Sequence, residues 1–160
     1  MTAIPADLAA EVRKLRADDL DDVVRIDALH TGQRKPEYWQ RVFGDFFNGG
    51  RDQPRVGLAA EAGGVVQGYL LGEVRAFEFG SEACGWVFAV GVDQRNLRSG
   101  VASSLLAEAC GQFARAGIGQ VRTMVRRNDV PVLSFFRSNR FVGGSFVQLE
   151  LDLELGEKEE

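Results

Sequence analysis

The sequence predicts an α/β protein in which helices cover one mixed β-sheet within a single domain. Three observations lead to this prediction. The chain has 160 residues, 45% of them hydrophobic, which suits one globular domain and is short for two. A nearly continuous apolar run, Cys84–Val92, is typical of a strand covered on both faces. Helical and strand patterns alternate after it, which favours parallel strand pairs in the second half.

The first half of the chain predicts a strand, two helices and a hairpin. Alternating polarity indicates a strand at Glu11–Arg16, and Asp18 or Asp19 is a suitable cap for the helix that follows. Pro36 opens a second helix, whose aromatic residues recur at helical spacing. The tight Gly63-Gly64 turn then predicts an antiparallel hairpin. Its two strands are expected at Arg55–Ala62 and Val65–Phe77.

The second half predicts helices and strands in alternation after Cys84–Val92. The expected elements are a helix at Gly100–Arg115, a strand at Gln120–Val125, a helix at Asp129–Ser138 and a strand at Phe146–Leu155. The whole order is therefore β-α-α-β-β-β-α-β-α-β. We expect one domain over residues 1–155, followed by an acidic tail over residues 156–160.

Charge and composition exclude several classes of protein. The formal net charge of −4 argues against a general nucleic-acid binder, which needs a basic surface. No apolar run is long enough to span a membrane, and the first residues do not resemble a secretory signal. Cys84 and Cys110 lack the paired spacing of a zinc site and read as free thiols. We therefore expect a cytoplasmic protein without a metal site.

The segment after Cys84–Val92 is the most informative part of the sequence. A short polar loop leads to Ser99-Gly100-Val101-Ala102, which opens a helix with small residues. The first amides of a helix have no acceptor within it, and the helix dipole favours an anion there. Together with Arg95 and Arg98, these amides predict a cradle for a diphosphate. The alternative is an ordinary strand-to-helix turn with two solvated arginines.

This arrangement resembles the GNAT superfamily of acyl-CoA-dependent N-acyltransferases, over roughly Arg13 to Leu153. The family's diphosphate motif, Arg/Gln-x-x-Gly-x-Gly/Ala, corresponds to Leu97-Arg98-Ser99-Gly100-Val101-Ala102, with Leu97 as a departure at the first position. The resemblance implies that acetyl-CoA binds there as the cosubstrate. It also implies a β-bulge in the preceding strand, where the backbone of Val90, Gly91 and Val92 would hold the pantetheine amides.

A second part of the resemblance lies downstream. The family's Asn…Tyr-x-x-x-Gly-Phe segment corresponds to a stretch in which Asn128 matches the asparagine and Phe141 the closing phenylalanine. The family's tyrosine, which usually protonates the leaving CoA thiolate, falls at Phe135 or Phe136, depending on the direction of counting. Neither phenylalanine can donate a proton. The resemblance still implies that Asn128, Phe135 and Phe136 contact the CoA arm.

The general base is not evident from the sequence. The family often uses a carboxylate near the centre of the sheet, and Glu73 on the predicted third strand is the best placed, ahead of Glu78 and Glu82. Asp27 is a second candidate because it continues the apolar stripe of a helix, where a carboxylate needs a partner. That partner could be Arg34. A solvent-exposed acid is the alternative in each case.

The resemblance places the acceptor pocket at the first two helices and their connection, around His30, Arg34 and Tyr38. We expect an N-acetyltransferase that acts on a primary amine of a small molecule, peptide or protein. The alternative is a non-catalytic module of the same fold that binds acyl-CoA for regulation. A dinucleotide-binding oxidoreductase fits poorly because the Gly-x-Gly-x-x-Gly pattern is missing. A homodimer is one candidate assembly.

Overall fold

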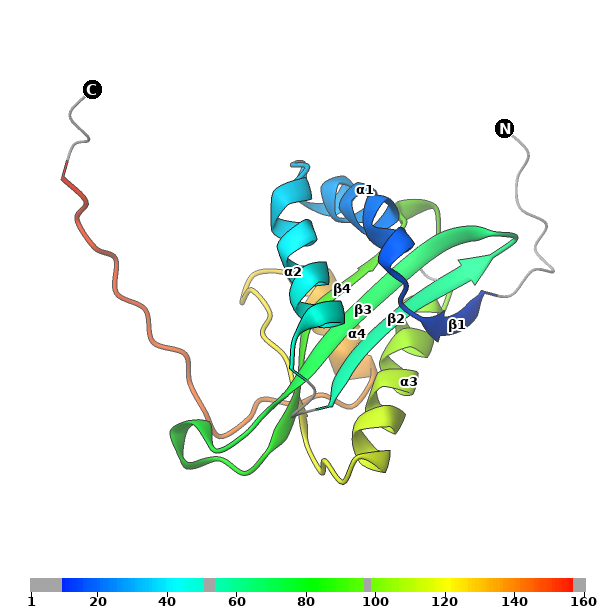
Figure 1. The fold of residues 1–160 in the computed structure, drawn as a ribbon. Helices are drawn as coiled ribbons and strands as arrows, with labels where there is room; N and C mark the ends of the chain where they lie inside the picture. Colours follow the sequence, from blue (N-terminus) through cyan, green and yellow to red (C-terminus); the bar gives the residue numbers. More distant parts are fainter. Residues whose placement is uncertain (1–9, 51–53, 97–98, 157–160) are drawn as a thin grey trace. The chain divides into compact units, whose positions relative to one another are not determined.

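The computed structural model describes residues 10–50, 54–96 and 99–156. The chain divides into two compact units, residues 1–124 and 125–160. Within the described ranges, the first unit contains the sheet and three α-helices, and the second contains one α-helix and the C-terminal segment (Figure 1). The extent of a single domain over residues 1–155 stays a prediction.

The described residues form one mixed sheet of five strands in the order β1-β2-β3-β4-β5. The strands are β1 (Glu11–Lys14), β2 (Arg55–Ala62), β3 (Val65–Arg75), β4 (Cys84–Val92) and β5 (Val121–Arg122). Neighbours pair antiparallel except β4 and β5, which are parallel. Gly63 and Gly64, with φ of 57° and 77°, supply the left-handed backbone of the hairpin turn. The predicted mixed α/β fold is confirmed.

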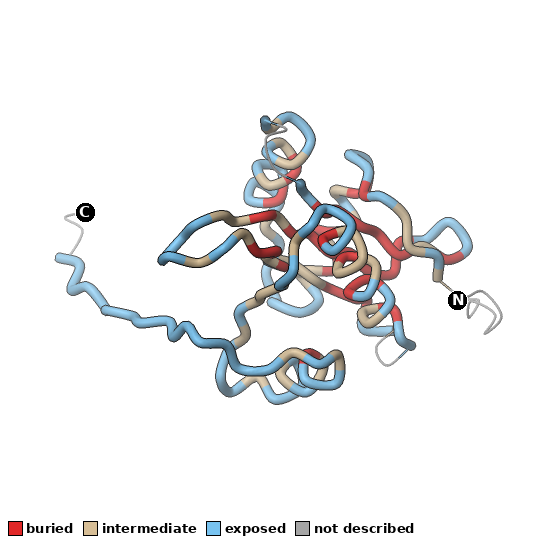
Figure 2. Tube along the Cα trace, turned by 90° about the horizontal axis from the view of Figure 1, so that it is seen from below, coloured by how far each residue is buried: buried red, intermediate tan, exposed pale blue. Residues whose placement is uncertain are grey.

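Helices cover both faces of this sheet (Figure 1). In the first unit they are α1 (Leu20–Thr31), α2 (Pro36–Asn48) and α3 (Val101–Arg115). Helices α1 and α2 form one core with β3, through Val23, Val24, Ile26, Trp39, Phe43, Tyr69 and Leu71. Figure 2 shows the buried residues gathered in the interior of this unit. The apolar stripes seen in the sequence therefore face the sheet, as expected for amphipathic helices.

Helix α3 packs closely on the opposite face because glycines lie beneath it. A Cβ at Gly68 would stand 3.1 Å from Val101 Cγ1, and one at Gly85 would stand 2.9 Å from Phe113 Cδ2. A larger residue at either position would push the helix away from the sheet. Gly68 thus sets the height at which the first turn of α3 meets the end of β4, and Gly85 sets the height of the last turn over the start of β4.

The predicted side-chain cap of α1 is absent. Asp19 precedes the helix, but its carboxylate accepts a hydrogen bond from the Arg13 guanidinium at 2.9 Å and from the Arg16 main-chain N–H at 2.7 Å. This ion pair to β1 engages the carboxylate, which therefore joins the first strand to the start of α1.

The second unit contains α4 (Val130–Ser138), where Asp129 caps the first turn by accepting a hydrogen bond from the Val132 main-chain N–H at 3.3 Å. The predicted final strand, Phe146–Leu155, is wrong for the structure of the single chain. The segment forms no strand and its residues are exposed. Alternating polarity suits a strand only when another strand pairs with it, and none of the described strands does so.

No helix among the described residues has the length and apolar character needed to cross a membrane.

Candidate cofactor and active site

The carboxyl half of β4 has an open edge on the side away from β3. Strand β5 pairs with β4 only at Gly85 and Trp86, so the predicted strand Gln120–Val125 is reduced to Val121–Arg122. The Thr123 hydroxyl then donates a hydrogen bond to the Val87 carbonyl at 2.9 Å. Beyond Val87, no described strand pairs with β4 on this side. We call the stretch from Phe88 to Val92 the open edge of β4.

A β-bulge stands at the start of the open edge. Leu71 of β3 pairs with Ala89, whereas the next residue, Gly72, pairs with Val87, so Phe88 is the extra residue. A bulge bends its strand and disrupts the local ladder. The strand thus turns away from β5 at the position where the two lose their pairing. The structure confirms the bulge that the family resemblance implied and places it at Phe88.

The register determines which main-chain groups point to the open edge. The Asp93 N–H donates a hydrogen bond to the Gln67 carbonyl at 2.8 Å, so residue 93 faces β3. Hydrogen-bonded positions alternate along an antiparallel pair, which makes Gly91 face β3 as well and directs Val90 and Val92 to the open edge. A contact from α1 supports this assignment: His30 Nε2 lies 2.5 Å from the Val92 carbonyl oxygen, which therefore does not point to β3.

Of the three predicted pantetheine contacts, Val90 and Val92 therefore present backbone groups at the open edge. Gly91 instead pairs with Tyr69 of β3. A Cβ at Gly91 would lie 2.7 Å from Tyr69 Cε1 and 2.8 Å from its hydroxyl oxygen. The glycine is thus required by packing against a buried tyrosine.

The N-terminus of α3 lies a short loop after β4. Gly100 precedes the helix with φ of 84°, a left-handed conformation that favours glycine. Apart from its chain neighbours, no atom of the described residues lies within 4 Å of the position that a Cβ would take there. The Ser104 N–H donates the first helical hydrogen bond, to the Gly100 carbonyl at 3.0 Å. The amides of Val101 and Ala102 precede that bond and have no acceptor within the helix.

The rest of the predicted cradle divides into two parts. The Ser99 amide donates a hydrogen bond to the Asn96 carbonyl at 3.2 Å, within the loop. Leu97 and Arg98 lie outside the described residues. The described cradle therefore consists of the Gly100 turn and the amides that follow it.

A buried carboxylate, Asp93, anchors the loop before the cradle. It accepts hydrogen bonds from the guanidinium of Arg25 at 2.8 Å and from that of Arg95 at 3.0 Å, with its side chain 3% exposed. The hydrogen bond from Arg95, with a further one from Arg25, holds the pKa of Asp93 well below its usual range, although burial opposes this shift. Arg95, predicted as a phosphate-binding cation, is thus paired with a carboxylate.

Sequence reasoning missed Asp93. The available signal was its position, because a carboxylate directly after a buried strand needs a cationic partner. The partner from α1 is 68 positions away in the chain and could not be identified from local spacing.

Helix α1 covers the face of β3 opposite to α3. There, two donors hold the carboxylate of Asp27. Trp39 Nε1 donates to its Oδ2 at 3.0 Å, and Lys35 Nζ lies 3.1 Å from the same oxygen. The proposed bond to Arg34 is wrong, since Lys35 and Trp39 take that place. Burial, and then the charge of Asp27, raise the pKa of the neighbouring Tyr69 hydroxyl. The hydroxyl thus stays protonated at neutral pH.

Glu73 lies on the same face of β3 as Tyr69, four residues along the strand, or about 13 Å away. Its carboxylate is 3.2 Å from Arg75 Nε and is 40% exposed. The Arg75 guanidinium lies over the Trp86 ring, 4.6 Å from its centroid. The structure therefore does not bring Glu73 and Asp27 together. Glu78 and Glu82 are exposed in the loop that follows β3.

In the second unit, Phe136 is buried and Phe135 is half-buried. The Phe136 ring meets those of Phe135 and Phe141 edge to face, with centroids 5.0 and 5.1 Å apart. Asn128 is exposed just before α4. Phe136 therefore belongs to an aromatic cluster of its own unit. In the described part of the chain, no group of three acidic, histidine or cysteine side chains is arranged to hold a metal ion.

Comparison with known proteins agrees with this geometry. The family model for the acetyltransferase (GNAT) family matches residues 20–141. Among curated proteins, no sequence matches the chain significantly. One similar structure is the aminoglycoside N-acetyltransferase AAC(6')-Iy in complex with CoA, with 13% identity and a TM-score of 0.78 over 94% of this chain and 99% of that one.

Two further structures share the fold. A ribosomal-protein-alanine N-acetyltransferase from Brucella melitensis biovar Abortus 2308 has 12% identity and a TM-score of 0.72, over 91% of this chain and all (100%) of that one. A transcriptional regulator from Bacillus halodurans C-125 has 16% identity and a TM-score of 0.74, over 90% and 99%. At these identities the likeness concerns the fold. With the family model spanning most of its length, the chain belongs to the acetyltransferase (GNAT) family.

Proposed function

We propose that this protein is an N-acetyltransferase that transfers the acetyl group of acetyl-CoA to a primary amine. One observation carries the proposal: the open edge of β4 leads through the loop anchored by Asp93 to the N-terminus of α3. An unpaired strand edge accepts an extended, amide-containing chain, and a helix N-terminus accepts an anion. CoA carries these two features in the same order, as pantetheine and diphosphate.

The residues present fit this ligand. Val90 and Val92 offer main-chain groups to the pantetheine amides, and the amides at Gly100, Val101 and Ala102 face the diphosphate. Gly100 matters twice, because its left-handed φ forms the turn and the space around it admits a phosphate oxygen. Leu97 and Arg98 lie outside the described residues and stay predicted contacts of the diphosphate. Ser99 is proposed as a further contact, through the loop that its amide closes onto the Asn96 carbonyl.

The proposed reaction is a direct attack on the thioester. The neutral amine forms a C–N bond to the carbonyl carbon, the C–S bond breaks, and the CoA thiolate leaves. Main-chain N–H groups at the open edge, such as that of Val90, would polarise the carbonyl oxygen as charge develops. The attacking amine loses a proton, and the thiolate takes one up.

Two carboxylates are candidates to accept the proton of the amine. Glu73 is the more exposed of the two and pairs with Arg75, so its carboxylate can exchange protons with the solvent. Asp27 is more enclosed, at 12% exposure, and Lys35 and Trp39 hold it in place. The substitutions Glu73→Gln and Asp27→Asn distinguish the two candidate bases. The variant that removes the base changes the pH profile of kcat, whereas a purely structural substitution lowers stability without moving that profile.

A second candidate function is an acyl-CoA-binding regulatory module. One observation favours it: phenylalanines stand where the family has a proton-donating tyrosine, and Phe136 is buried among aromatic rings. General acid catalysis typically contributes 10²–10⁴-fold, so its loss slows transfer without preventing it. Asn128 and Phe135 would still serve to contact the CoA arm.

The acceptor would bind near α1 and α2, where His30, Arg34 and Tyr38 are exposed. Of the similar structures, one is an aminoglycoside acetyltransferase and another a ribosomal-protein-alanine acetyltransferase. Both small-molecule and protein amines are therefore proposed as acceptors. The expected cytoplasmic location and homodimer belong to the same proposal.

The test is thiol release from acetyl-CoA over a panel of small amines, peptides and proteins, beside calorimetric titration with CoA. We expect CoA to bind and at least one amine to release thiol. Binding without release on the panel supports the regulatory module instead. Absence of CoA binding by folded protein contradicts both functions.

A further inference from the structure

The hydroxyl group of the buried Tyr69, on β3, takes no part in the hydrogen bonds of the described residues. The residue as a whole is 3% exposed. Over the described ranges, no polar side-chain atom is both fully buried and unpaired, so the small exposed part of Tyr69 includes its hydroxyl oxygen. Polar groups in a protein interior are normally hydrogen-bonded, and an exception calls for an explanation. Here it indicates that a ligand becomes the partner of the hydroxyl.

The ring of Tyr69 extends from β3 across β4. Tyr69 pairs with Gly91, and directly opposed residues point to the same face of a sheet, here the face of α1 and α2. A Cβ at Gly91 would lie 2.8 Å from the hydroxyl oxygen, so the tip of the side chain lies over β4. Val90 and Val92 flank Gly91 and face the open edge. A chain bound along that edge lies about 4.8 Å beyond β4, within reach of the hydroxyl.

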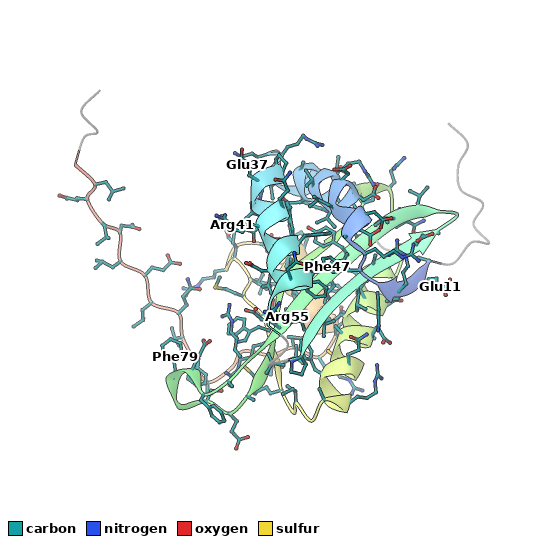
Figure 3. All side chains as sticks on the ribbon, in the orientation of Figure 1. Glu11, Glu37, Arg41, Phe47, Arg55 and Phe79 are labelled. Carbon is teal, nitrogen blue, oxygen red and sulfur yellow. The ribbon has the colours of Figure 1, made fainter. Side chains whose placement is uncertain are left out.

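Helix α2 holds the ring of Tyr69 in this position. Glu37 and Arg41 project outward from α2 (Figure 3), and Trp39, half a turn from each, faces the sheet. Its ring meets that of Tyr69 edge to face, with centroids 5.5 Å apart. Trp39 is fixed in turn by the hydrogen bond from its Nε1 to Asp27. The hydroxyl therefore has a defined position, which a group that acts on a bound ligand requires.

We propose that the Tyr69 hydroxyl binds the sulfur of CoA and protonates it as the thiolate leaves. The proposal rests on the acetyl transfer proposed above. When the pantetheine amides pair with Val90 and Val92, and the Val90 N–H polarises the thioester carbonyl, the sulfur lies beside Gly91 and the hydroxyl over it. Phenylalanines stand where the family has its proton-donating tyrosine. Tyr69 supplies a donor from the sheet instead.

The proposed step conserves protons and electrons. As the C–S bond breaks, its electron pair passes to sulfur, and the Tyr69 O–H proton moves to sulfur to form the CoA thiol. The amine gives a proton to the base on forming the C–N bond, and an equal proton returns through water to the tyrosinate. Burial and the charge of Asp27 raise the pKa of Tyr69 and so disfavour the tyrosinate. Proton transfer to sulfur should therefore be coupled to this return.

The first test measures binding and needs no turnover. The native chain and Tyr69→Phe are titrated calorimetrically with CoA and with desulfo-CoA, in which hydrogen replaces the thiol. The titrations are run at about pH 9, where a thiol of pKa about 8.5 is largely ionised and accepts a stronger hydrogen bond. We expect Tyr69→Phe to raise the Kd for CoA about tenfold or more, and that for desulfo-CoA less than twofold. Equal changes for the two ligands would overturn the proposal.

The second test measures the rate of acetyl transfer in a single turnover with an accepted amine. Tyr69→Phe should lower this rate about 100-fold or more, because general acid catalysis is lost, and should change KM for the amine less than threefold. The control is Ser81→Ala, which removes a hydroxyl from the loop between β3 and β4, before the other end of β4. Phe79 marks the tip of this loop in Figure 3. The control should transfer at the native rate.

The outcomes distinguish failure of this proposal from failure of the proposed function. If Tyr69→Phe transfers acetyl groups at the native rate, the role of Tyr69 is refuted and the function stands. A rise in KM for the amine at an unchanged rate places the hydroxyl at the acceptor and also overturns the proposal. A native chain that transfers nothing refutes the function and the protonation step, and the comparison of CoA with desulfo-CoA then decides whether Tyr69 binds the sulfur.

Tyr69→Phe should fold as the native chain does. It removes a hydroxyl that has no partner among the described residues and keeps the ring that packs on Trp39. Thermal unfolding should therefore give the native Tm. A clearly lower Tm would show that the hydroxyl stabilises the fold itself, which contradicts a hydroxyl free to bind a ligand.

Discussion

The imidazole of His30, on α1, lies against the main-chain carbonyl of Val92 at the end of β4, with Nε2 2.5 Å from the oxygen. The two residues are 62 positions apart, so the contact ties the first helix to the strand end that leads into the cradle. It also marks the direction of that carbonyl, toward the open edge. The proposed pantetheine site is therefore supported from α1 as well as from the sheet.

This contact gives the first prediction. Replacing His30 with Ala removes one hydrogen bond, worth about 0.5–1.5 kcal/mol, and leaves the Val92 carbonyl less fixed. We expect the Kd for CoA to rise about three- to tenfold by calorimetry. The matched control is Gln94→Ala, which removes the bond from Gln94 Nε2 to the Leu29 carbonyl, 2.9 Å long. Equal effects of the two variants would contradict the role of His30.

The second prediction concerns Gly100. Its φ of 84° lies where other residues are strained by about 1–2 kcal/mol, and a side chain there would occupy the space proposed for a phosphate oxygen. Gly100→Leu should therefore lower stability modestly and raise the Kd for CoA at least 100-fold. Thermal unfolding and calorimetric titration measure the two effects.

Gly117 provides the control, because it lies just after the other end of α3 with φ of 82° and has no atom within 4 Å of the position that a Cβ would take. Gly117→Leu should cost about the same stability as Gly100→Leu, at about 1–2 kcal/mol. Its affinity for CoA should not change. If both variants lose affinity equally, the loss is a consequence of strain and the cradle is misplaced.

The third prediction is a pH dependence set by Asp93. Arg95 and Arg25 depress its pKa in the folded protein below the ordinary value of 3.8. A depressed pKa stabilises the fold above pH 3.8, and this stability is lost as the pH falls through the folded value. Asp93→Asn should cost about 1–3 kcal/mol at neutral pH, by urea unfolding.

The difference in unfolding free energy between the native chain and Asp93→Asn should shrink as the pH falls below 3.8. Asp21 of α1 is exposed, and Asp21→Asn should show no comparable difference at any pH. A difference for Asp93→Asn that stays constant down to about pH 2 would show that the carboxylate charge contributes nothing to the fold.

The fourth prediction separates the two phenylalanines of α4. Phe136 is 5% exposed, so Phe136→Tyr buries a hydroxyl and should cost about 1–3 kcal/mol. Phe135 is half-buried, and Phe135→Tyr should cost less than half as much. If the missing proton donor limits transfer, Phe135→Tyr should raise kcat tenfold or more. An unchanged kcat in a folded Phe135→Tyr variant would show that solvent or another group protonates the thiolate.

Much of the fold follows from local patterns in the sequence. Cys84–Val92 is a strand over the predicted residues, but the expected cover on both faces is incomplete, since Phe88 is 40% exposed and Trp86, Ala89 and Val90 are half-buried. Pro36 and the glycine pair 63–64 likewise begin a helix and close a hairpin as expected. The prediction for Phe146–Leu155 failed, because alternating polarity describes a single strand and says nothing of its partner. Whether that strand forms depends on a neighbour, which a local pattern does not reveal.

The candidate site was predicted in outline only. Gly100 could be located because small residues that open a helix after a short polar loop form a local sequence pattern. The direction of the Val90 and Val92 backbone groups depends on the bulge at Phe88, which is fixed by pairing with β3. The partners of Asp27 and Asp93 come from packing between separate elements. Contacts between residues far apart in the chain produce no regular spacing from which they could be predicted.

The most direct test of the central claim is a crystal structure of the protein with CoA bound. We predict that the pantetheine amides pair with the main chain of Val90 and Val92, and that the diphosphate contacts the amides at Gly100, Val101 and Ala102. CoA bound elsewhere on the protein, with the open edge of β4 and the first turn of α3 free of ligand, would contradict the account.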